Sequence, residues 1–137
     1  MIIFRQKILF FLFFVFLDQL TKFFVLKNNF SHLCNPYISW GIPLTGFWFW
    51  FVLILAFLFL FYLAKQEHFS YPVLLLGAGA LGNLIDRWHF HCVIDFISFS
   101  AIPYLNKLNF LTSFPTFNLA DLLITVGVLF LLFSKRN

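Results

Sequence analysis

Charged residues are scarce in this chain of 137 residues. They make up 10% of the sequence, only five of them are acidic, and hydrophobic residues make up 62%. Soluble domains carry about 25% charged residues, so the composition argues against a soluble domain and predicts an integral membrane protein. Internal repeats and flexible linkers are also lacking, and the length predicts a single domain over residues 1–137.

Four apolar stretches predict four transmembrane helices. The second stretch contains no charged residue and would be about 27 Å long as a helix, which is enough to cross a bilayer. We attribute the 24 phenylalanines to lipid-facing surface or codon-usage bias and derive no site from them. The predicted spans are residues 8–26, 47–64, 69–87 and 117–133.

The N-terminal segment resembles a cleavable signal peptide, because "RQK" precedes the apolar run "ILFFLFFVFL". No small-residue cleavage site follows that run. The next residues, "DQLTK", continue a helical pattern. We therefore expect a retained first helix.

Basic residues at the ends of the apolar stretches predict the orientation. Cytoplasmic termini place five of them inside and three outside, and both long loops then face outward. The net charge of +4 is explained by cytoplasmic anchoring, so we expect no nucleic-acid partner. The inner set is Arg5, Lys7, Lys65, Lys135 and Arg136, and the outer set is Lys27, Arg87 and Lys107.

This topology brings polar residues from distant parts of the chain together at the outer face of the membrane, where the third span ends and the fourth begins. We call this place the outer mouth. Two aspartates placed close together cannot both ionise cheaply, so one keeps a proton while the other acts as a base. Such a pair could activate a water molecule and protonate a leaving amine, as in peptide hydrolysis. The residues expected there are Asn83, Asp86, Arg87, Asp95, Asn118 and Asp121, with Asn35 nearby. Alternatively, Asp121 caps its helix and Asp95 pairs with Arg87.

Four short motifs occur in order along the chain. They are "DQLTK" at 18–22, "GALGNLIDR" at 79–87, "VIDF" at 93–96 and "FNLAD" at 117–121. Their order, their placement on the apolar stretches and the chain length resemble the lipoprotein signal peptidase family, the type II signal peptidases. The resemblance covers nearly the whole chain.

The resemblance implies an all-α integral membrane protein of four transmembrane helices with a small extracytoplasmic β-platform and a loop helix over the cleft. It implies an aspartyl endopeptidase that removes the signal peptide of a prolipoprotein just before a diacylglyceryl-modified cysteine. Asp95 and Asp121 would be the catalytic pair. Asn35, Asn83, Arg87 and Asn118 match site-lining positions, and Asp18, Lys22 and Asp86 match supporting ones.

The resemblance also implies a location and partners. We expect a multi-pass protein of the bacterial cytoplasmic (inner) membrane with its active site at the extracytoplasmic face. The partners would be lipidated prolipoprotein signal peptides and membrane lipid, with no cofactor and no metal, and we expect a monomer. Two residues depart from the family pattern, since Tyr37 and His91 stand where Gly is common, and the loop over 97–113 is long.

Each supporting motif also has a structural interpretation. Asp18 and Lys22 lie four residues apart and predict an intramembrane ion pair, which we prefer to a catalytic role. Asn83 and Asn118 could tie helices together. Arg87 could anchor its helix at the membrane interface.

The string "HFHC" at 89–92 offers a rival site. His89, His91 and Cys92 could bind zinc with Asp95, or Cys92 could be a nucleophile beside a histidine. No regular ligand spacing supports either hypothesis. Cys34 and Cys92 both lie on predicted outer loops, so a disulfide is possible in an oxidising compartment, but the sequence leaves their pairing open.

Two other functions compete with peptide hydrolysis. A small four-span proton-coupled transporter needs a buried carboxylate, and Asp18 fits that role. A transporter gives no role to Asp95 in a loop or to Asp121 at a helix mouth. A structural assembly factor gives no reason for two acids and two asparagines to gather at one face.

Overall fold

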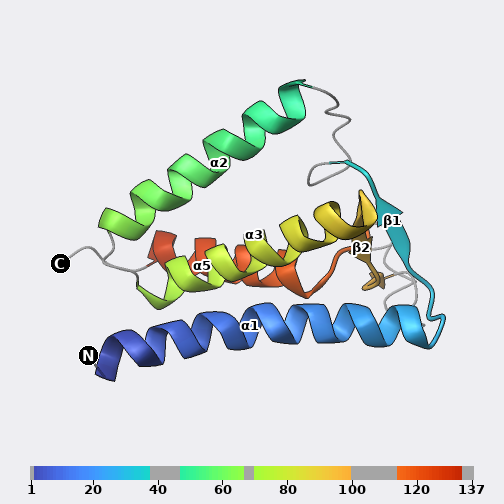
Figure 1. Cartoon of the computed structure of the whole chain (residues 1–137), viewed down its shortest axis with the longest axis horizontal. Helices are drawn as coiled ribbons and strands as arrows, with labels where there is room; N and C mark the ends of the chain where they lie inside the picture. Colours follow the sequence, from blue (N-terminus) through green and yellow to red (C-terminus); the bar gives the residue numbers. More distant parts are fainter. Residues whose placement is uncertain (1, 38–46, 67–69, 100–113, 134–137) are drawn as a thin grey trace.

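The computed structural model describes residues 2–37, 47–66, 70–99 and 114–133. Helices α3 and α5 pack closely together, α1 lies along α3, and α2 lies on the outer side of α3, while the strands sit at one end of the helices (Figure 1). The elements in chain order are α1 (Ile2–Lys27), β1 (Leu33–Asn35), α2 (Phe47–Gln66), α3 (Tyr71–Phe90), β2 (Val93–Asp95) and α5 (Leu119–Phe133).

Each predicted apolar stretch contains a helix, and two helix ends differ from the prediction by three residues or more. Helix α1 begins at Ile2 instead of residue 8, and α3 continues to Phe90 instead of ending at 87. Basic side chains in the last turn suit the negative end of a helix dipole, and α3 has Arg87 and His89 there. His91 caps the helix after Phe90: its φ of 61° is left-handed, and its N–H donates to the Arg87 carbonyl at 3.1 Å. This left-handed cap explains why Gly would suit the position.

The number of membrane spans stays a prediction. Within the described residues, one helix, Ile3–Lys27, is long and apolar enough to cross a membrane by length and composition. Phe51–Lys65 and Leu119–Phe133 are shorter apolar helices. Large hydrophobic side chains are exposed on α1, α2 and α5, for example Phe4, Phe57 and Phe133, as the lipid-facing interpretation of the phenylalanines predicts.

Small residues let α3 approach its neighbours closely. A Cβ atom on Gly79 would collide with the Ala120 carbonyl of α5, and one on Gly82 would collide with the Asp18 carboxylate of α1. Such close approach is typical of helices that associate in lipid. It brings the polar residues of α1, α3 and α5 within hydrogen-bonding distance of one another.

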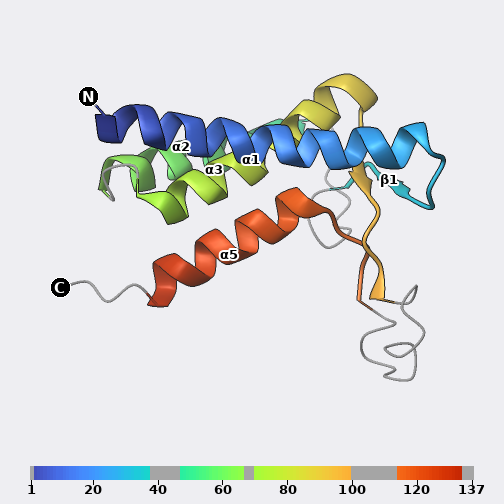
Figure 2. The same ribbon diagram turned by 90° about the horizontal axis from the view of Figure 1, so that it is seen from below.

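The predicted β-platform is a small two-stranded antiparallel sheet at one end of the helices, and Figure 2 shows the same arrangement from below. Leu33 pairs with Asp95, Cys34 with Ile94 and Asn35 with Val93. Cys34 and Cys92 form a disulfide, which settles the pairing that the sequence left open. The implied loop helix is not among the described elements, and the loop residues 38–46 and 100–113 lie outside them.

Candidate active site

The two candidate catalytic aspartates come from different elements. Asp95 is the last residue of β2, and Asp121 lies in the first turn of α5. The expectation that Asp95 belongs to a loop was wrong, because "VID" pairs with β1 through backbone hydrogen bonds. Asp95 is almost completely buried, with 2% of its surface exposed. A strand and a helix end therefore hold the two acids, and neither depends on loop conformation.

Two asparagine side chains connect the carboxylates. Asn118 Nδ2 donates to Asp95 Oδ1 at 2.8 Å and to Asn83 Oδ1 at 3.0 Å. Asn83 Nδ2 donates in turn to Asp121 Oδ1 at 2.8 Å. The structure thus brings together four side chains that the predicted topology placed at one mouth.

Asp121 also caps its own helix, as the alternative interpretation proposed. Asn118 is the N-cap residue of α5, and its Oδ1 accepts the Asp121 backbone N–H at 3.0 Å. Asp121 Oδ2 accepts the Asn118 backbone N–H at 3.3 Å. This reciprocal pair is a capping box built from Asn and Asp. Capping uses Oδ2, so Asp121 Oδ1 remains available to Asn83.

Donor-only partners fix the orientation of both amides. Asn83 Oδ1 accepts from Lys22 Nζ at 3.2 Å, and Asn118 Oδ1 accepts from the backbone N–H of Asp121. An ammonium group and a backbone N–H can only donate, so each amide oxygen must face them. Both amide nitrogens consequently face the carboxylates of Asp95 and Asp121.

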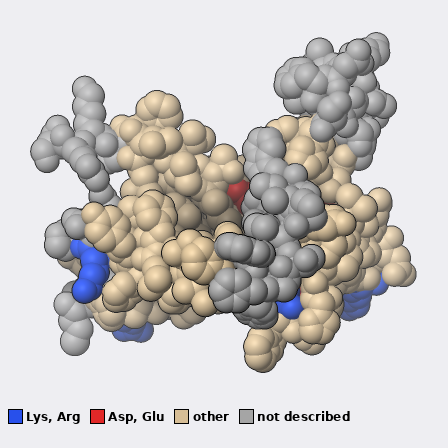
Figure 3. All heavy atoms as spheres, turned by 90° about the horizontal axis from the view of Figure 1, so that it is seen from above, with Lys and Arg blue, Asp and Glu red and all other residues tan. Residues whose placement is uncertain are grey.

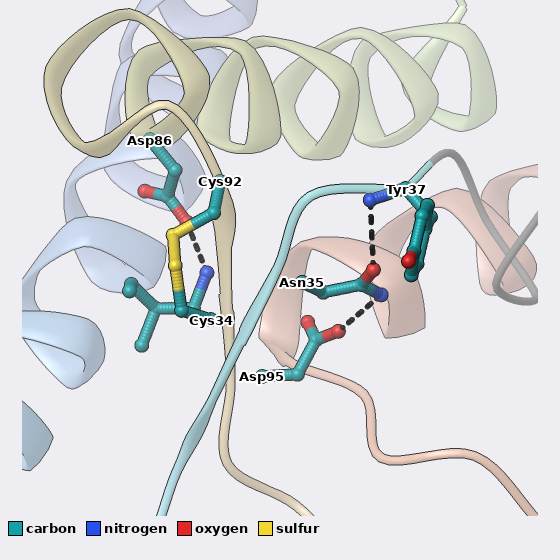
Figure 4. Close-up of a disulfide and its surroundings, with 7 residues drawn as sticks. Cys34, Asn35, Tyr37, Asp86, Cys92 and Asp95 are labelled. Carbon is teal, nitrogen blue, oxygen red and sulfur yellow. Dashed lines mark hydrogen bonds between the residues drawn. A yellow bond between two sulfur atoms is a disulfide. The ribbon is translucent and has the colours of Figure 1, made fainter. Parts of the chain in front are cut away.

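Asn35 and Arg87 connect the first outer segment to this cluster. Asn35 Nδ2 donates to Asp95 Oδ2 at 2.9 Å, and Asn35 Oδ1 accepts the Tyr37 N–H at 3.0 Å (Figure 4). Arg87 donates to the Asn83 carbonyl and to the Tyr37 carbonyl, both at 3.1 Å. Arg87 therefore joins α3 to the segment after β1 and is more than an interfacial anchor.

A buried ion cluster lies behind the site. Lys22 Nζ contacts Asp18 Oδ2 and Asp86 Oδ2, each at 2.8 Å, and these three side chains are 2% exposed or less. Asp18 accepts the Ala120 N–H at 2.9 Å, and Asp86 accepts the Ile94 N–H at 3.1 Å. The predicted Asp18–Lys22 ion pair is confirmed. Asp86, which the topology placed at the outer mouth and the resemblance placed among the supporting residues, lies in this cluster, where its carboxylate compensates the buried Lys22.

Burial raises the pKa of Asp95 to about 6. The hydrogen bonds from Asn35 and Asn118 and the charge of Lys22 act in the opposite direction, while the negative charge of Asp121 raises the pKa further. Asp95 is therefore protonated at mildly acidic pH, when ordinary aspartates are ionised. One acid that holds a proton beside a second carboxylate is the arrangement required for general acid and base catalysis.

A cavity of about 340 Å³ opens beside the aspartates. Figure 3 shows acidic atoms at the bottom of a hollow on a surface with few charged side chains. Its lining combines polar and apolar side chains, so it suits an apolar peptide with a reacting amide bond. The polar lining includes Asn35, Asn83, Arg87, Asp95 and Asp121, and the apolar lining includes Phe99, Phe114, Phe117, Leu122 and Ile124.

Sequence reasoning missed the aromatic wall of this cavity. The rings of Phe99, Phe114 and Phe117 contact one another, with centroids 5.5 to 6.0 Å apart. No signal distinguishes them in a sequence with 24 phenylalanines. Gln19 was also missed, although it lies within "DQLTK", and its side chain donates to Asp86 and to the Gly82 carbonyl.

The rival histidine and cysteine site is not supported. Cys92 is bonded to Cys34 and is therefore no free nucleophile. His89 lies in α3 and His91 caps it, and strand β2 begins only at Val93. Within the part of the chain that the structure describes, no group of three or more His, Cys, Asp or Glu residues could hold a metal ion.

Comparison with known proteins adds independent information. A family model described as Signal peptidase (SPase) II matches residues 10–135. A lipoprotein signal peptidase of Syntrophus aciditrophicus (strain SB) is 36% identical over 141 residues, which cover 84% of this chain and 82% of that protein. A lipoprotein signal peptidase of Microcystis aeruginosa is 41% identical over 73 residues, which cover 53% of this chain and 39% of that protein.

Two solved structures of a bacterial membrane enzyme have a similar fold. One, at 2.3 Å resolution, has a TM-score of 0.73 at 30% identity and covers 94% of this chain and 86% of its own. The other, at 1.9 Å resolution, has a TM-score of 0.74 at 28% identity and covers 96% of this chain and 94% of its own. The similarity therefore extends over almost the whole chain.

Proposed function

This chain belongs to the signal peptidase II family, and we propose that it is an aspartyl endopeptidase in which Asp95 and Asp121 form the catalytic pair. Family membership makes it a membrane protease that processes prolipoproteins. The substrate in our proposal is a diacylglyceryl-modified prolipoprotein, cut just before the lipidated cysteine. One observation carries the proposal: the carboxylates of Asp95 and Asp121 are linked through two asparagines and line one cavity.

The pKa of Asp95 supports a division of roles. Asp121, as the charged base, takes a proton from a water molecule whose oxygen attacks the peptide carbonyl carbon. Asp95, as the acid, gives its proton to the carbonyl oxygen. The tetrahedral intermediate collapses when Asp121 returns its proton to the amide nitrogen, the C–N bond breaks, and Asp95 recovers its proton from the hydroxyl group. The products are the signal-peptide carboxylate and the free amine of the cysteine.

The neighbouring residues would position this chemistry. Asn83 and Asn118 direct their N–H groups at the two carboxylates, and Asn35 donates to Asp95 from the other side. Asp18, Lys22 and Asp86 hold the helices that carry the site. All of these residues come from one chain, so we propose that the protein acts as a monomer.

Activity should depend on the proton held by Asp95. That proton is present below a pH of about 6 and is lost as the pH rises through this value. We therefore expect kcat/KM to fall above pH 6. The pH dependence of kcat/KM reports the pKa of the acid in the free enzyme. Infrared spectra of wild type minus Asp95→Asn should show a protonated carboxyl band at pH 5 that disappears by pH 8. A kcat/KM that stays level from pH 5 to 8 would contradict the role of Asp95 as the acid.

We further propose four membrane spans with cytoplasmic termini and the site at the extracytoplasmic face. The start of α1 and the end of α5 lie at the end of the molecule opposite the sheet, which supports placing the termini and the site on opposite faces of the membrane (Figure 1). A cysteine added after the C-terminus should react with a membrane-impermeant maleimide only after the bacterial membrane is opened. Reaction in intact spheroplasts would reverse the orientation and with it the location of the site.

The lipid on the substrate cysteine should increase the rate of cleavage, because it positions the cleavage point. A diacylglyceryl group would hold the cleavage point at the depth of the cavity, since each buried methylene contributes about 0.8 kcal/mol to anchoring. We expect a prolipoprotein peptide with an unmodified cysteine to be cut at least about tenfold more slowly than the lipidated peptide. Both peptides are assayed in the same detergent, at concentrations where both are fully partitioned. Equal rates there would contradict the lipid-positioning argument.

The transporter alternative depended on Asp18 as a proton carrier. Asp18 is 0% exposed and accepts hydrogen bonds from Lys22, Gln19 and the Ala120 N–H. A carboxylate held in this way has a structural role and lacks the water access that proton coupling requires.

A further inference from the structure

Strand β1 is weakly supported by its surroundings. It has only three residues, and Leu33 and Cys34 are exposed while Asn35 is half-buried. Its partner β2 is fully buried. A two-stranded ribbon alone is marginally stable. Yet β1 supplies Asn35, whose amide must stay within 2.9 Å of Asp95.

The disulfide joins this exposed strand to a buried anchor. Cys34 directly precedes Asn35, and Cys92 lies between the cap of α3 and the start of β2, with 3% of its surface exposed. Successive side chains on a strand point to opposite faces. Figure 4 shows the disulfide on one side of β1 and Asn35, directed at Asp95, on the other. The bond can therefore hold β1 in place without occupying the cavity.

We propose that the Cys34–Cys92 disulfide is a positioning element for the reaction, which holds Asn35 against Asp95, and that its reduction lowers turnover while the protein stays folded. This inference rests on the proposed function, because it requires Asp95 to act in catalysis. The helices and the ion cluster of Asp18, Lys22 and Asp86 do not involve the disulfide, so the fold persists without it. The cysteines act through Asn35 and do not touch the substrate.

Reduction has a defined chemical effect. Dithiothreitol supplies two electrons and two protons, becomes a cyclic disulfide, and leaves two thiols at Cys34 and Cys92. Strand β1 then has no covalent link to Cys92 and depends on its short backbone pairing with β2 and on the hydrogen bonds of Asn35 and Tyr37. The Asn35 hydrogen bond lowers the pKa of Asp95, so its loss raises that pKa. The charges of Asp121 and Lys22, which also act on the pKa of Asp95, do not depend on the disulfide.

The first test measures turnover of the folded enzyme before and after reduction. Wild type reduced with dithiothreitol and then assayed in detergent with lipidated prolipoprotein peptide at pH 5, where Asp95 holds its proton with or without the disulfide, should have a kcat roughly tenfold lower than the oxidised enzyme, in line with loss of a hydrogen bond to an acid. Activity should return on re-oxidation, and the alkaline limb of the pH profile should move to higher pH while the disulfide is open. The matched control is Cys34→Ser/Cys92→Ser, which should start at the low kcat and not respond to dithiothreitol.

The second test is a double-mutant cycle between the disulfide and Asn35. Asn35→Ala should lower kcat about as much as reduction does, and reducing Asn35→Ala should cause little further loss. If the kcat losses caused by reduction and by Asn35→Ala multiply, the disulfide acts independently of Asn35 and the proposal is wrong. It is equally overturned if reduced wild type keeps its kcat, or if reduction converts the protein to an unfolded form on size exclusion. An oxidised wild type without any cleavage activity would instead refute the proposed function.

Discussion

Replacing either aspartate of the pair should abolish cleavage while leaving the protein folded. We expect Asp95→Asn and Asp121→Asn each to lower kcat by at least about a hundredfold, because general acid or base catalysis contributes about 10² to 10⁴. An amide has nearly the same volume as the carboxylate, and its oxygen can still accept one of the hydrogen bonds that each carboxylate receives, from Asn118 at position 95 or from Asn83 at position 121. Turnover of lipidated prolipoprotein peptide, measured per folded molecule, tests this expectation.

The matched control for these two variants is Asp18→Asn. It makes the same carboxyl-to-amide change at a fully buried site behind the cavity, where the aspartate pairs with Lys22. This variant should lower the amount of folded protein but leave the turnover of each folded molecule close to that of wild type. If Asp95→Asn or Asp121→Asn kept near-normal turnover, the two-aspartate mechanism would be wrong.

Lys22→Met should be the most destabilising single change in the ion cluster. It leaves the carboxylates of Asp18 and Asp86 buried without their shared cation. Removal of one partner from a buried ion pair costs about 3–5 kcal/mol. We expect a much lower yield of folded protein and a clearly lower midpoint of thermal unfolding in detergent.

Lys27→Met is the control for that change, since Lys27 lies on the same helix but is exposed, with its ammonium group over the ring of Phe23. Its thermal midpoint should stay near that of wild type. Equal midpoints for the Lys22 and Lys27 variants would mean that the cluster does not hold the helices together. A triple change that neutralises Asp18, Lys22 and Asp86 should be less damaging than Lys22→Met, because no charge is left unpaired.

The sequence predicted the helices and the candidate acids because both depend on local patterns. Apolar stretches predict helices, and the motifs around Asp95 and Asp121 lie in short contiguous segments. The spacing of Asp18 and Lys22 also predicted their ion pair, since residues four apart share a helix face. The resemblance placed Asp86 among the supporting residues, but its contact with Lys22 could not be predicted from spacing, because it depends on how α1 and α3 pack.

Contacts between outer segments could not be predicted from the sequence. The hydrogen bond from Asn35 to Asp95 and the disulfide next to it depend on the register of two three-residue strands. Such short strands have almost no periodic signal. The link from Arg87 to Tyr37 uses a backbone carbonyl, which side-chain identity does not reveal. The left-handed conformation of His91 similarly depends on where α3 ends.

The most direct test of the central claim is the mass of the products formed from one defined substrate. Purified protein is incubated with a labelled prolipoprotein peptide that carries diacylglyceryl on its cysteine, and both fragments are measured by mass spectrometry. Our account predicts a released signal peptide and a shortened, still lipidated fragment that begins with the cysteine, with neither product formed by Asp95→Asn or Asp121→Asn. Cleavage at another bond, or the same products from either variant, would contradict it.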